Sequence, residues 1–137
     1  MIKNNPAARL LHTMIRVADL ERSIAFYVGK LGMTVKRRAD YPVGRYTLIF
    51  LAFEADPAGA EIELTYNWDT SGYDLGSGYG HIAIGVTDVV THVTHLAARG
   101  VPVIRKAGPR LDEPGEIIAF VEDPDGYKIE LIQIAPA

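Results

Sequence analysis

Residues 10–19 read LLHTMIRVAD, and residues 79–88 read YGHIAIGVTD. The two stretches share a histidine, a valine and an aspartate at matching places, 69 residues apart. In the first copy, alternate residues from Leu11 to Val17 fall on one face of an extended chain, which is typical of a strand. The aspartate that follows is a favoured N-cap of a helix. The repeat therefore predicts that a strand followed by a helix occurs twice.

Each of these aspartates is followed by apolar residues at helical spacing. After Asp19 the spacing predicts an amphipathic helix of about three turns, ended by Gly32. After Asp88 it predicts a second helix, ended by Gly100. Both helices should bury one apolar face.

Three β-rich runs separated by Pro- and Gly-containing turns follow each predicted helix. They read MTVKRRA, RYTLIFLAF and AEIELTY in the first copy, and VPVIRKA, EIIAFVED and YKIELIQI in the second. The fold class is therefore α+β, with two βαβββ modules in tandem. We expect a first module over 10–66, a linker over 67–80 and a second module over 81–134, within a single compact domain.

Composition narrows the classes of function. A chain of 137 residues with a net charge of -3 gives no electrostatic reason to expect nucleic acid or an anionic membrane as partner. The absence of cysteine excludes disulfides, thiolate zinc sites and cysteine nucleophiles. No stretch approaches the ~20 apolar residues of a membrane span. We expect a cytoplasmic protein that acts on a small molecule.

In the last strand of each module, one face bears glutamate and the opposite face is purely apolar. Glu63 shares its face with Glu61, Thr65 and Asn67, and Glu130 shares its face with Lys128, Ile132 and Ile134. The apolar faces should pack on the helices, which leaves the glutamates lining a concave sheet. His12 precedes Glu63 by 51 residues and His81 precedes Glu130 by 49. A carboxylate inside such a cavity is costly unless it is paired or bound to a metal.

Two imidazoles and two carboxylates suit one divalent cation. They neutralise its charge, and a six-coordinate ion would keep two open positions for water or substrate. Nickel, cobalt, iron, manganese and zinc are all chemically admissible. The alternatives are satisfied histidines with solvated glutamates, or a closed structural zinc site, which usually relies on cysteine. The matched spacing in both modules favours the metal site.

Four segments carry a resemblance to a known family: LLHTMIRVADLERSIAFY, IELTYNW, YGHIAI and AFVEDPDGYKIELI. Through them, the span from Leu10 to Ile134 resembles glyoxalase I enzymes of the vicinal oxygen chelate superfamily, and it is similar above all to the short bacterial members. The resemblance implies paired modules that form open eight-stranded, barrel-like sheets. It also implies a homodimer whose sites lie between the first module of one subunit and the second module of the other.

The activity that the resemblance implies is a lyase reaction of methylglyoxal detoxification. The hemithioacetal of methylglyoxal and glutathione would be isomerised to S-lactoylglutathione, with glutathione as co-substrate. His12, Glu63, His81 and Glu130 match the metal ligands, one metal per site. A histidine as the first ligand is similar to the forms that nickel or cobalt activates in preference to zinc.

The chemistry suggests roles for the two carboxylates. Moving hydrogen between adjacent carbons of an α-hydroxy carbonyl requires a base that removes a weakly acidic C–H proton. We hypothesise that Glu130 is this base and that Glu63 is a possible partner on the opposite face.

Four further residues are candidates for substrate binding. Arg16 and Asn67 each lie four residues from a ligand on the same strand face, about 13 Å along the strand, which suits an extended tripeptide. The resemblance assigns both to glutathione; the alternatives are a strand-end salt bridge and a turn residue. Arg105 and Lys106 are candidates for the glycine-end carboxylate, with a solvated edge strand as the alternative. The acidic loop 108–116 departs from the family pattern.

Three other functions fit parts of this pattern. An extradiol dioxygenase would use iron on two histidines and one glutamate, and here a second glutamate would fill a position that oxygen needs. An acyl-thioester epimerase would share the proton abstraction. A non-catalytic protein that sequesters a ligand would not need the complete set of four metal ligands.

Overall fold

The computed structural model describes residues 7–136. The chain divides into two compact units, the first ending at Tyr73 and the second beginning at Asp74. None of the helices in the described part of the chain has the length and apolar character that crossing a membrane requires.

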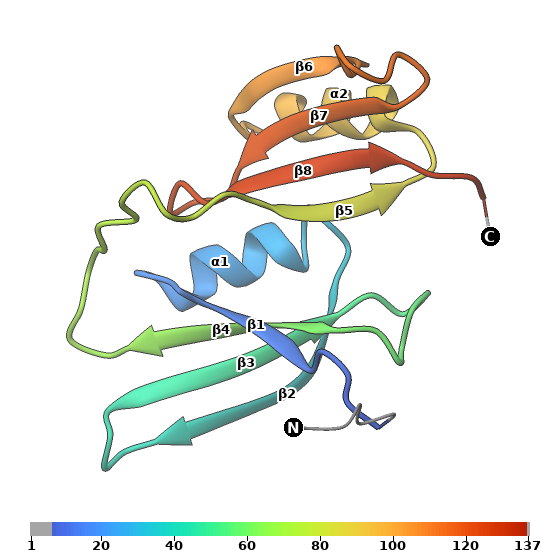
Figure 1. Cartoon of the computed structure of the whole chain (residues 1–137). Coiled ribbons are helices and arrows are strands. Elements are labelled where there is room, and N and C mark those ends of the chain that lie inside the picture. Colours follow the sequence, from blue (N-terminus) through green and yellow to red (C-terminus); the bar gives the residue numbers. More distant parts are fainter. Residues whose placement is uncertain (1–6, 137) are drawn as a thin grey trace, which may run out of the picture. The chain divides into compact units, whose positions relative to one another are not determined.

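The first unit contains one helix and a four-stranded sheet (Figure 1). Its elements are β1 (His12–Arg16), α1 (Leu20–Tyr27), β2 (Thr34–Tyr41), β3 (Tyr46–Ala52) and β4 (Glu61–Asn67). The strand order is β1-β4-β3-β2; β1 is parallel to β4, and the other pairs are antiparallel.

The second unit repeats this arrangement. Its elements are β5 (Ile82–Val86), α2 (Val89–Ala98), β6 (Val103–Pro109), β7 (Ile117–Glu122) and β8 (Lys128–Gln133). The strand order β5-β8-β7-β6, with β5 parallel to β8, matches that of the first unit. The predicted α+β fold of two βαβββ modules is therefore confirmed.

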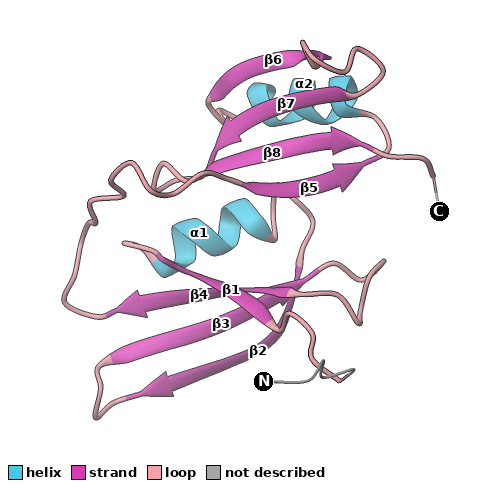
Figure 2. Cartoon of the chain, in the orientation of Figure 1, coloured by secondary structure: helices cyan, strands magenta, loops and turns pink. Residues whose placement is uncertain are grey.

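In each unit the helix lies over one face of its sheet (Figure 2). The strand residues predicted to face the helices are buried: Leu64, Ile129 and Leu131 are fully covered. The opposite, glutamate-bearing faces are less covered, and they form the surfaces on which the candidate residues stand.

The predicted caps are present at both helices. The Asp19 carboxylate accepts a hydrogen bond from the Arg22 backbone N–H, and Asp88 accepts one from Thr91, each at 3.0 Å. The bonds from Thr91 lower the pKa of the Asp88 carboxyl. Gly100 has a positive φ of 84°, which fits its place after the helix, because L side chains rarely adopt that conformation.

The first helix is shorter than the spacing predicts. It ends at Tyr27, and turns rather than helix continue to Gly32, which has a φ of 82°. Gly29 lies two residues after the end of the helix, and glycine disfavours helical backbone by about 1 kcal/mol relative to alanine. The predicted length of about three turns was therefore wrong. Gly32 follows the turns that come after the helix, and it does not end the helix itself.

Candidate metal centre

The first unit brings together His12 and Glu63. Because β1 and β4 are parallel with His12 opposite Glu61, the residue two further along β4 is Glu63, on the same face. The His12 Nε2 atom lies 3.8 Å from the Glu63 Oε1 atom. The glutamate side chain is 13% exposed and the histidine side chain 37%.

The second unit brings together His81 and Glu130 in the same way. His81 directly precedes β5, and Glu130 lies in the middle of β8. The His81 Nε2 atom lies 3.1 Å from the Glu130 Oε1 atom, with the glutamate side chain 12% exposed and the histidine 42%. In both units a largely covered carboxylate thus meets a more open imidazole.

A phenylalanine stands beside each pair, and sequence reasoning missed both rings. Phe50 on β3 is the cross-strand partner of Glu63, and its ring meets His12 edge-on with centroids 5.4 Å apart. Phe120 on β7 is the partner of Glu130 and meets His81 at 5.2 Å. Both lie in the β-rich runs TLIFLAF and IIAFVED, so aligning the two modules could have found them.

The donor atoms fit a divalent cation. Two atoms that each lie ~2.1 Å from one ion are about 3 to 3.6 Å apart at ordinary coordination angles. The separation of 3.1 Å in the second pair lies within this range, and that of 3.8 Å in the first pair lies just outside it. Each pair supplies one imidazole nitrogen and one carboxylate oxygen. Within residues 7–136, however, no three His, Asp or Glu side chains come together in a group that could hold a metal ion. Each unit therefore presents half of the expected set of donors.

Arg16 and Asn67 lie at the far end of the first unit's open face. Arg16 is opposite Thr65, two residues before Asn67 on β4. The Asn67 side-chain amide donates a hydrogen bond to the Tyr73 hydroxyl at 2.9 Å. This end of the face is polar and lies beyond the His12 and Glu63 pair, where the spacing along the strands places it.

The corresponding end of the second unit is apolar. Gly85 stands where Arg16 stands in the first unit, and Ile134 packs against it. A Cβ atom on Gly85 would lie 2.8 Å from the Ile134 Cδ1 atom, so this close approach requires glycine or a shift of the isoleucine. Of these two corresponding ends, only that of the first unit carries side chains that could bind a charged group.

Arg105 and Lys106 have different surroundings. The Arg105 guanidinium donates to four backbone carbonyls, those of Lys106, Gly108, Pro109 and Ile118, at 2.7 to 3.3 Å. These bonds hold the irregular stretch of β6 between Arg105 and Gly108. Lys106 is exposed. In the acidic loop, Arg110 neutralises Glu116 through an ion pair of 2.9 Å.

The linker aromatics pack close to their own units. The Trp68 indole N–H donates to the Thr47 hydroxyl at 2.9 Å. The Tyr79 hydroxyl donates to the Lys128 carbonyl at 3.2 Å, and burial raises the pKa of Tyr79 to about 12. Tyr79 is therefore a protonated donor at neutral pH, and it anchors the start of β8 just before Glu130.

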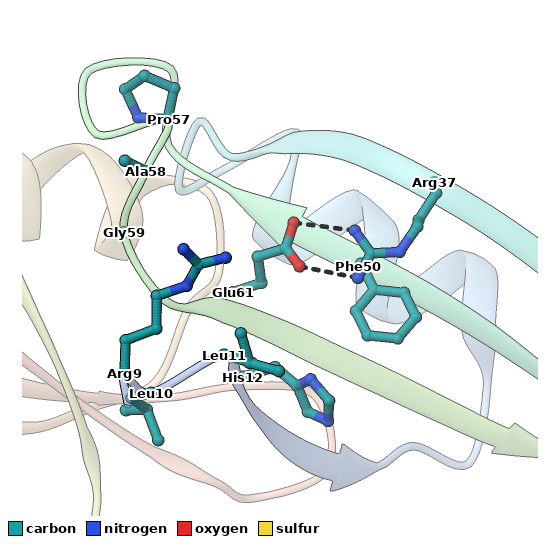
Figure 3. A pocket seen from close by; sticks show the side chains of 10 residues that line it. All are labelled: Arg9, Leu10, Leu11, His12, Arg37, Phe50, Pro57, Ala58, Gly59 and Glu61. Atoms are coloured by element: carbon teal, nitrogen blue, oxygen red, sulfur yellow. Dashed lines mark hydrogen bonds and ion pairs between the residues drawn. The ribbon is translucent and has the colours of Figure 1, made fainter. Parts of the chain in front are cut away.

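A cavity of about 520 Å³ opens beside His12 in the first unit (Figure 3). Apolar residues of the N-terminal segment and of the loop before β4 form part of its wall, together with Arg9, Arg37, Phe50 and Glu61. Sequence reasoning did not single out Arg9 or Arg37. A small organic molecule could occupy this volume next to the His12 imidazole.

Comparison with known families gives one match that covers most of the chain. Residues 9–131 match the Glyoxalase/Bleomycin resistance protein/Dioxygenase superfamily. A probable lactoylglutathione lyase of Synechocystis is 52% identical over 124 residues, which cover 90% of this chain and 94% of the relative. A lactoylglutathione lyase of Neisseria meningitidis is 52% identical over 125 residues, 91% of this chain and 90% of the relative.

Solved structures of glyoxalase I are also similar to this chain. The trypanothione-dependent glyoxalase I of Leishmania major has a TM-score of 0.80 at 47% identity, covering 93% of this chain and 87% of that protein. Glyoxalase I of Zea mays has a TM-score of 0.88 at 40% identity over 94% of this chain. The chain spans only 46% of the maize protein.

Proposed function

The chain belongs to the Glyoxalase/Bleomycin resistance protein/Dioxygenase superfamily, and from that premise we propose that it is a lactoylglutathione lyase. It converts the hemithioacetal of methylglyoxal and glutathione to S-lactoylglutathione. Two relatives that bear this activity in their names share about half of their residues with it over nearly their full length. The observation that carries the proposal is the repeated pairing of His12 with Glu63 and of His81 with Glu130.

These four residues would hold one divalent metal, with nickel or cobalt favoured. When bound, the metal would supply an electrophile for the oxygens of the substrate. The residues of the chain fix the donor geometry: each glutamate is mostly covered, and each imidazole is walled on one side by a phenylalanine ring. Ring contacts of this kind limit the rotation of a histidine and keep its Nε2 atom directed at the neighbouring carboxylate.

Glu130 is the base of the reaction. Its carboxylate accepts the C–H proton from the hydroxyl-bearing carbon of the hemithioacetal, and the electron pair left behind forms an enediolate. The proton is then returned to the adjacent carbon, while the hydroxyl proton passes from the first oxygen to the second, so that the first oxygen becomes the thioester carbonyl and the second a hydroxyl. No atom is gained or lost overall, as an isomerisation requires. Glu63 is the corresponding carboxylate in the pair of the first unit. We call each pair of one histidine and one glutamate a half-site. Low exposure of both carboxylates keeps bulk water from exchanging the proton before it is returned.

The complete site forms in a homodimer. Each unit of the chain supplies one histidine and one glutamate, and each pair lies on the open face of a four-stranded sheet. Joining the first unit of one subunit to the second unit of another would complete two equal sites. A two-fold symmetric dimer of this kind is the commonest arrangement of homo-oligomers.

Arg16 and Asn67 bind the γ-glutamyl end of glutathione. A guanidinium and an amide can hold a carboxylate and an amine, and both side chains lie beyond the metal pair on the polar end of the first unit. Arg105 would bind the glycine-end carboxylate only after releasing some of its four carbonyl acceptors, so Lys106, which is exposed, is the better candidate there.

Replacing Arg16 by alanine tests this assignment. Loss of one charge-assisted hydrogen bond is expected to raise KM for the hemithioacetal about 10- to 100-fold, with a smaller change in kcat. The dissociation constant of a non-reacting S-alkyl glutathione should rise by the same factor. Arg22→Ala, on the exposed side of α1, is the matched control and should leave both values unchanged. An unchanged dissociation constant for Arg16→Ala would remove Arg16 from the glutathione site.

The activity itself is tested by following thioester absorbance after metal-free protein, reloaded separately with Ni²⁺, Co²⁺ or Zn²⁺, is added to preformed hemithioacetal. Thioester formation with Ni²⁺ or Co²⁺, and none without metal, is the expected result. No thioester with any of these metals would reject the proposal. Oxygen uptake with a catechol would instead support an extradiol dioxygenase, and epimerisation of an acyl thioester would support an acyl-thioester epimerase.

A further inference from the structure

Two carboxylates, not one, lie on the open face of β4. Glu61 and Glu63 are two residues apart and therefore share a face of the strand. Glu61 is directly opposite His12 in the parallel pairing of β1 and β4, where neighbouring strands are ~4.8 Å apart. Glu61 is also mostly covered, with a side chain that is 18% exposed. By position alone, either glutamate could share a cation with His12.

Arg37 engages both oxygens of Glu61. Its Nη2 atom donates to Glu61 Oε1 at 2.9 Å, and its Nη1 atom donates to Oε2 at 3.2 Å (Figure 3). The guanidinium carbon also lies 3.8 Å from the centre of the Phe50 ring. Bidentate pairing combined with stacking on an aromatic face fixes a guanidinium in a way that a single contact does not. Both oxygens of Glu61 are thereby engaged by Arg37, and within residues 7–136 Glu61 does not form a three-donor group with His12 and Glu63.

In the second unit, a lysine stands at the position that corresponds to Glu61. Lys128 stands on β8 where Glu61 stands on β4, two residues before the ligand glutamate. A second carboxylate is therefore absent at that place. Arg105 occupies the position of Arg37, opposite the phenylalanine of β7, and turns its guanidinium to backbone carbonyls. At this position the guanidinium pairs with a carboxylate in the first unit and with backbone carbonyls in the second.

We propose that Arg37 is a positioning residue that withholds Glu61 from the metal, so that His12 and Glu63 are the only donors of the first half-site. This inference rests on the proposed function, because it presupposes a metal on that half-site. A third carboxylate would turn a donor set that balances a divalent charge into one with an excess negative charge, and it would fill a position that substrate oxygens need. Arg37 keeps the charge balanced and the position open.

Arg37→Met removes the guanidinium while keeping an unbranched side chain against Phe50. We expect Co²⁺ binding to tighten about tenfold, because a released carboxylate joins the donors. The visible absorption spectrum of the Co²⁺ protein should change in intensity, since added coordination weakens these bands, and kcat should fall. Arg38→Met is the matched control: Arg38 is the next residue of β2 and pairs with Glu21 on α1, so its loss should change none of these measurements.

The double variant Arg37→Met with Glu61→Gln separates ligand selection from packing. Without the second carboxylate, Co²⁺ affinity, absorption spectrum and kcat should return to within about twofold of the original protein. If the double variant stays impaired, Arg37 acts only through its packing on Phe50 and the inference is overturned. An unchanged Co²⁺ spectrum in Arg37→Met alone would also overturn it.

The proposed function fails in a different way. If the original protein bound no Co²⁺, or if Glu63→Gln left its affinity and spectrum unchanged, the half-site itself would be rejected. Thermal unfolding of each variant, expected within a few degrees of the original, shows that the comparison is made between folded proteins.

Discussion

Replacing Glu130 by glutamine is expected to lower kcat for the hemithioacetal by about 10³-fold, within the range that a general base contributes. Glutamine keeps the size of the side chain but cannot accept the substrate proton. Because the Glu130 side chain is only 12% exposed and lies 3.1 Å from His81, the substitution leaves little room for water to replace the lost base. Much of the metal binding should survive, since the amide oxygen remains a donor.

Two measurements decide the role of Glu130. Thioester absorbance gives kcat, and the metal content of the purified variant shows whether the site is still loaded. Glu122→Gln is the matched control, because Glu122 is opposite Lys128 in the same sheet and has no assigned role. Its kcat should stay within about twofold of the original. A Glu130→Gln variant that retains near-normal kcat would refute the assignment of the base.

Mixing two inactive variants is expected to restore activity if the complete site spans two subunits. His12→Ala destroys the first half-site and His81→Ala the second, so each variant alone should lose at least about 10³-fold in activity with its metal. In a mixed dimer, one of the two sites combines the intact halves of both chains. Random exchange makes half of the dimers mixed, so activity should return to about a quarter of the original level.

A second mixture controls for this result. His12→Ala combined with Glu63→Gln places both defects in the first half-site, so neither site of a mixed dimer is intact and no activity should return. Unfolding and refolding the variants together allows the subunits to exchange, and the thioester assay measures the outcome. If neither mixture recovers activity although mixed dimers form, the site is completed within one chain and the shared-site proposal fails.

The strand-and-helix pattern of each unit could be predicted from the sequence because local chemistry decides it. Asp19 and Asp88 cap the helices as their side chains allow, and the alternating runs became strands within about two residues of their expected bounds. The length of α1 could not be predicted, because the spacing of apolar residues continued through Gly29 while the helix did not.

The two pairs of histidine and glutamate could be predicted because the sequence repeats them. His12 and Glu63 lie far apart in the chain, but the repeat in His81 and Glu130 marked both pairs as related positions. Pairing of the first strand with the last in each unit then brought each histidine to its glutamate. The roles of these four residues in metal binding remain predictions.

Arg37 could not be found from the pattern of its strand. Simple alternation places Arg37 on the same face as Val35, which pairs with the fully buried Leu51. A bulge between Val35 and Arg37 shifts the register, so that Arg37 pairs with Phe50 and faces the open side. The second unit has a shift between Val103 and Arg105 at the corresponding place. A one-residue shift reverses the side of every following residue, and no local signal in the sequence announces it.

The contact between Gly85 and Ile134 makes the two repeated modules chemically different at corresponding positions. A protein built from two identical copies would offer the same residues at both ends, and an elongated ligand could enter it in either direction. Here an arginine at position 85 could not fit without displacing Ile134, whereas position 16 already carries one. The first unit thus carries a charged side chain at a position where the second unit carries none, so the corresponding ends of the two repeats are no longer chemically equivalent.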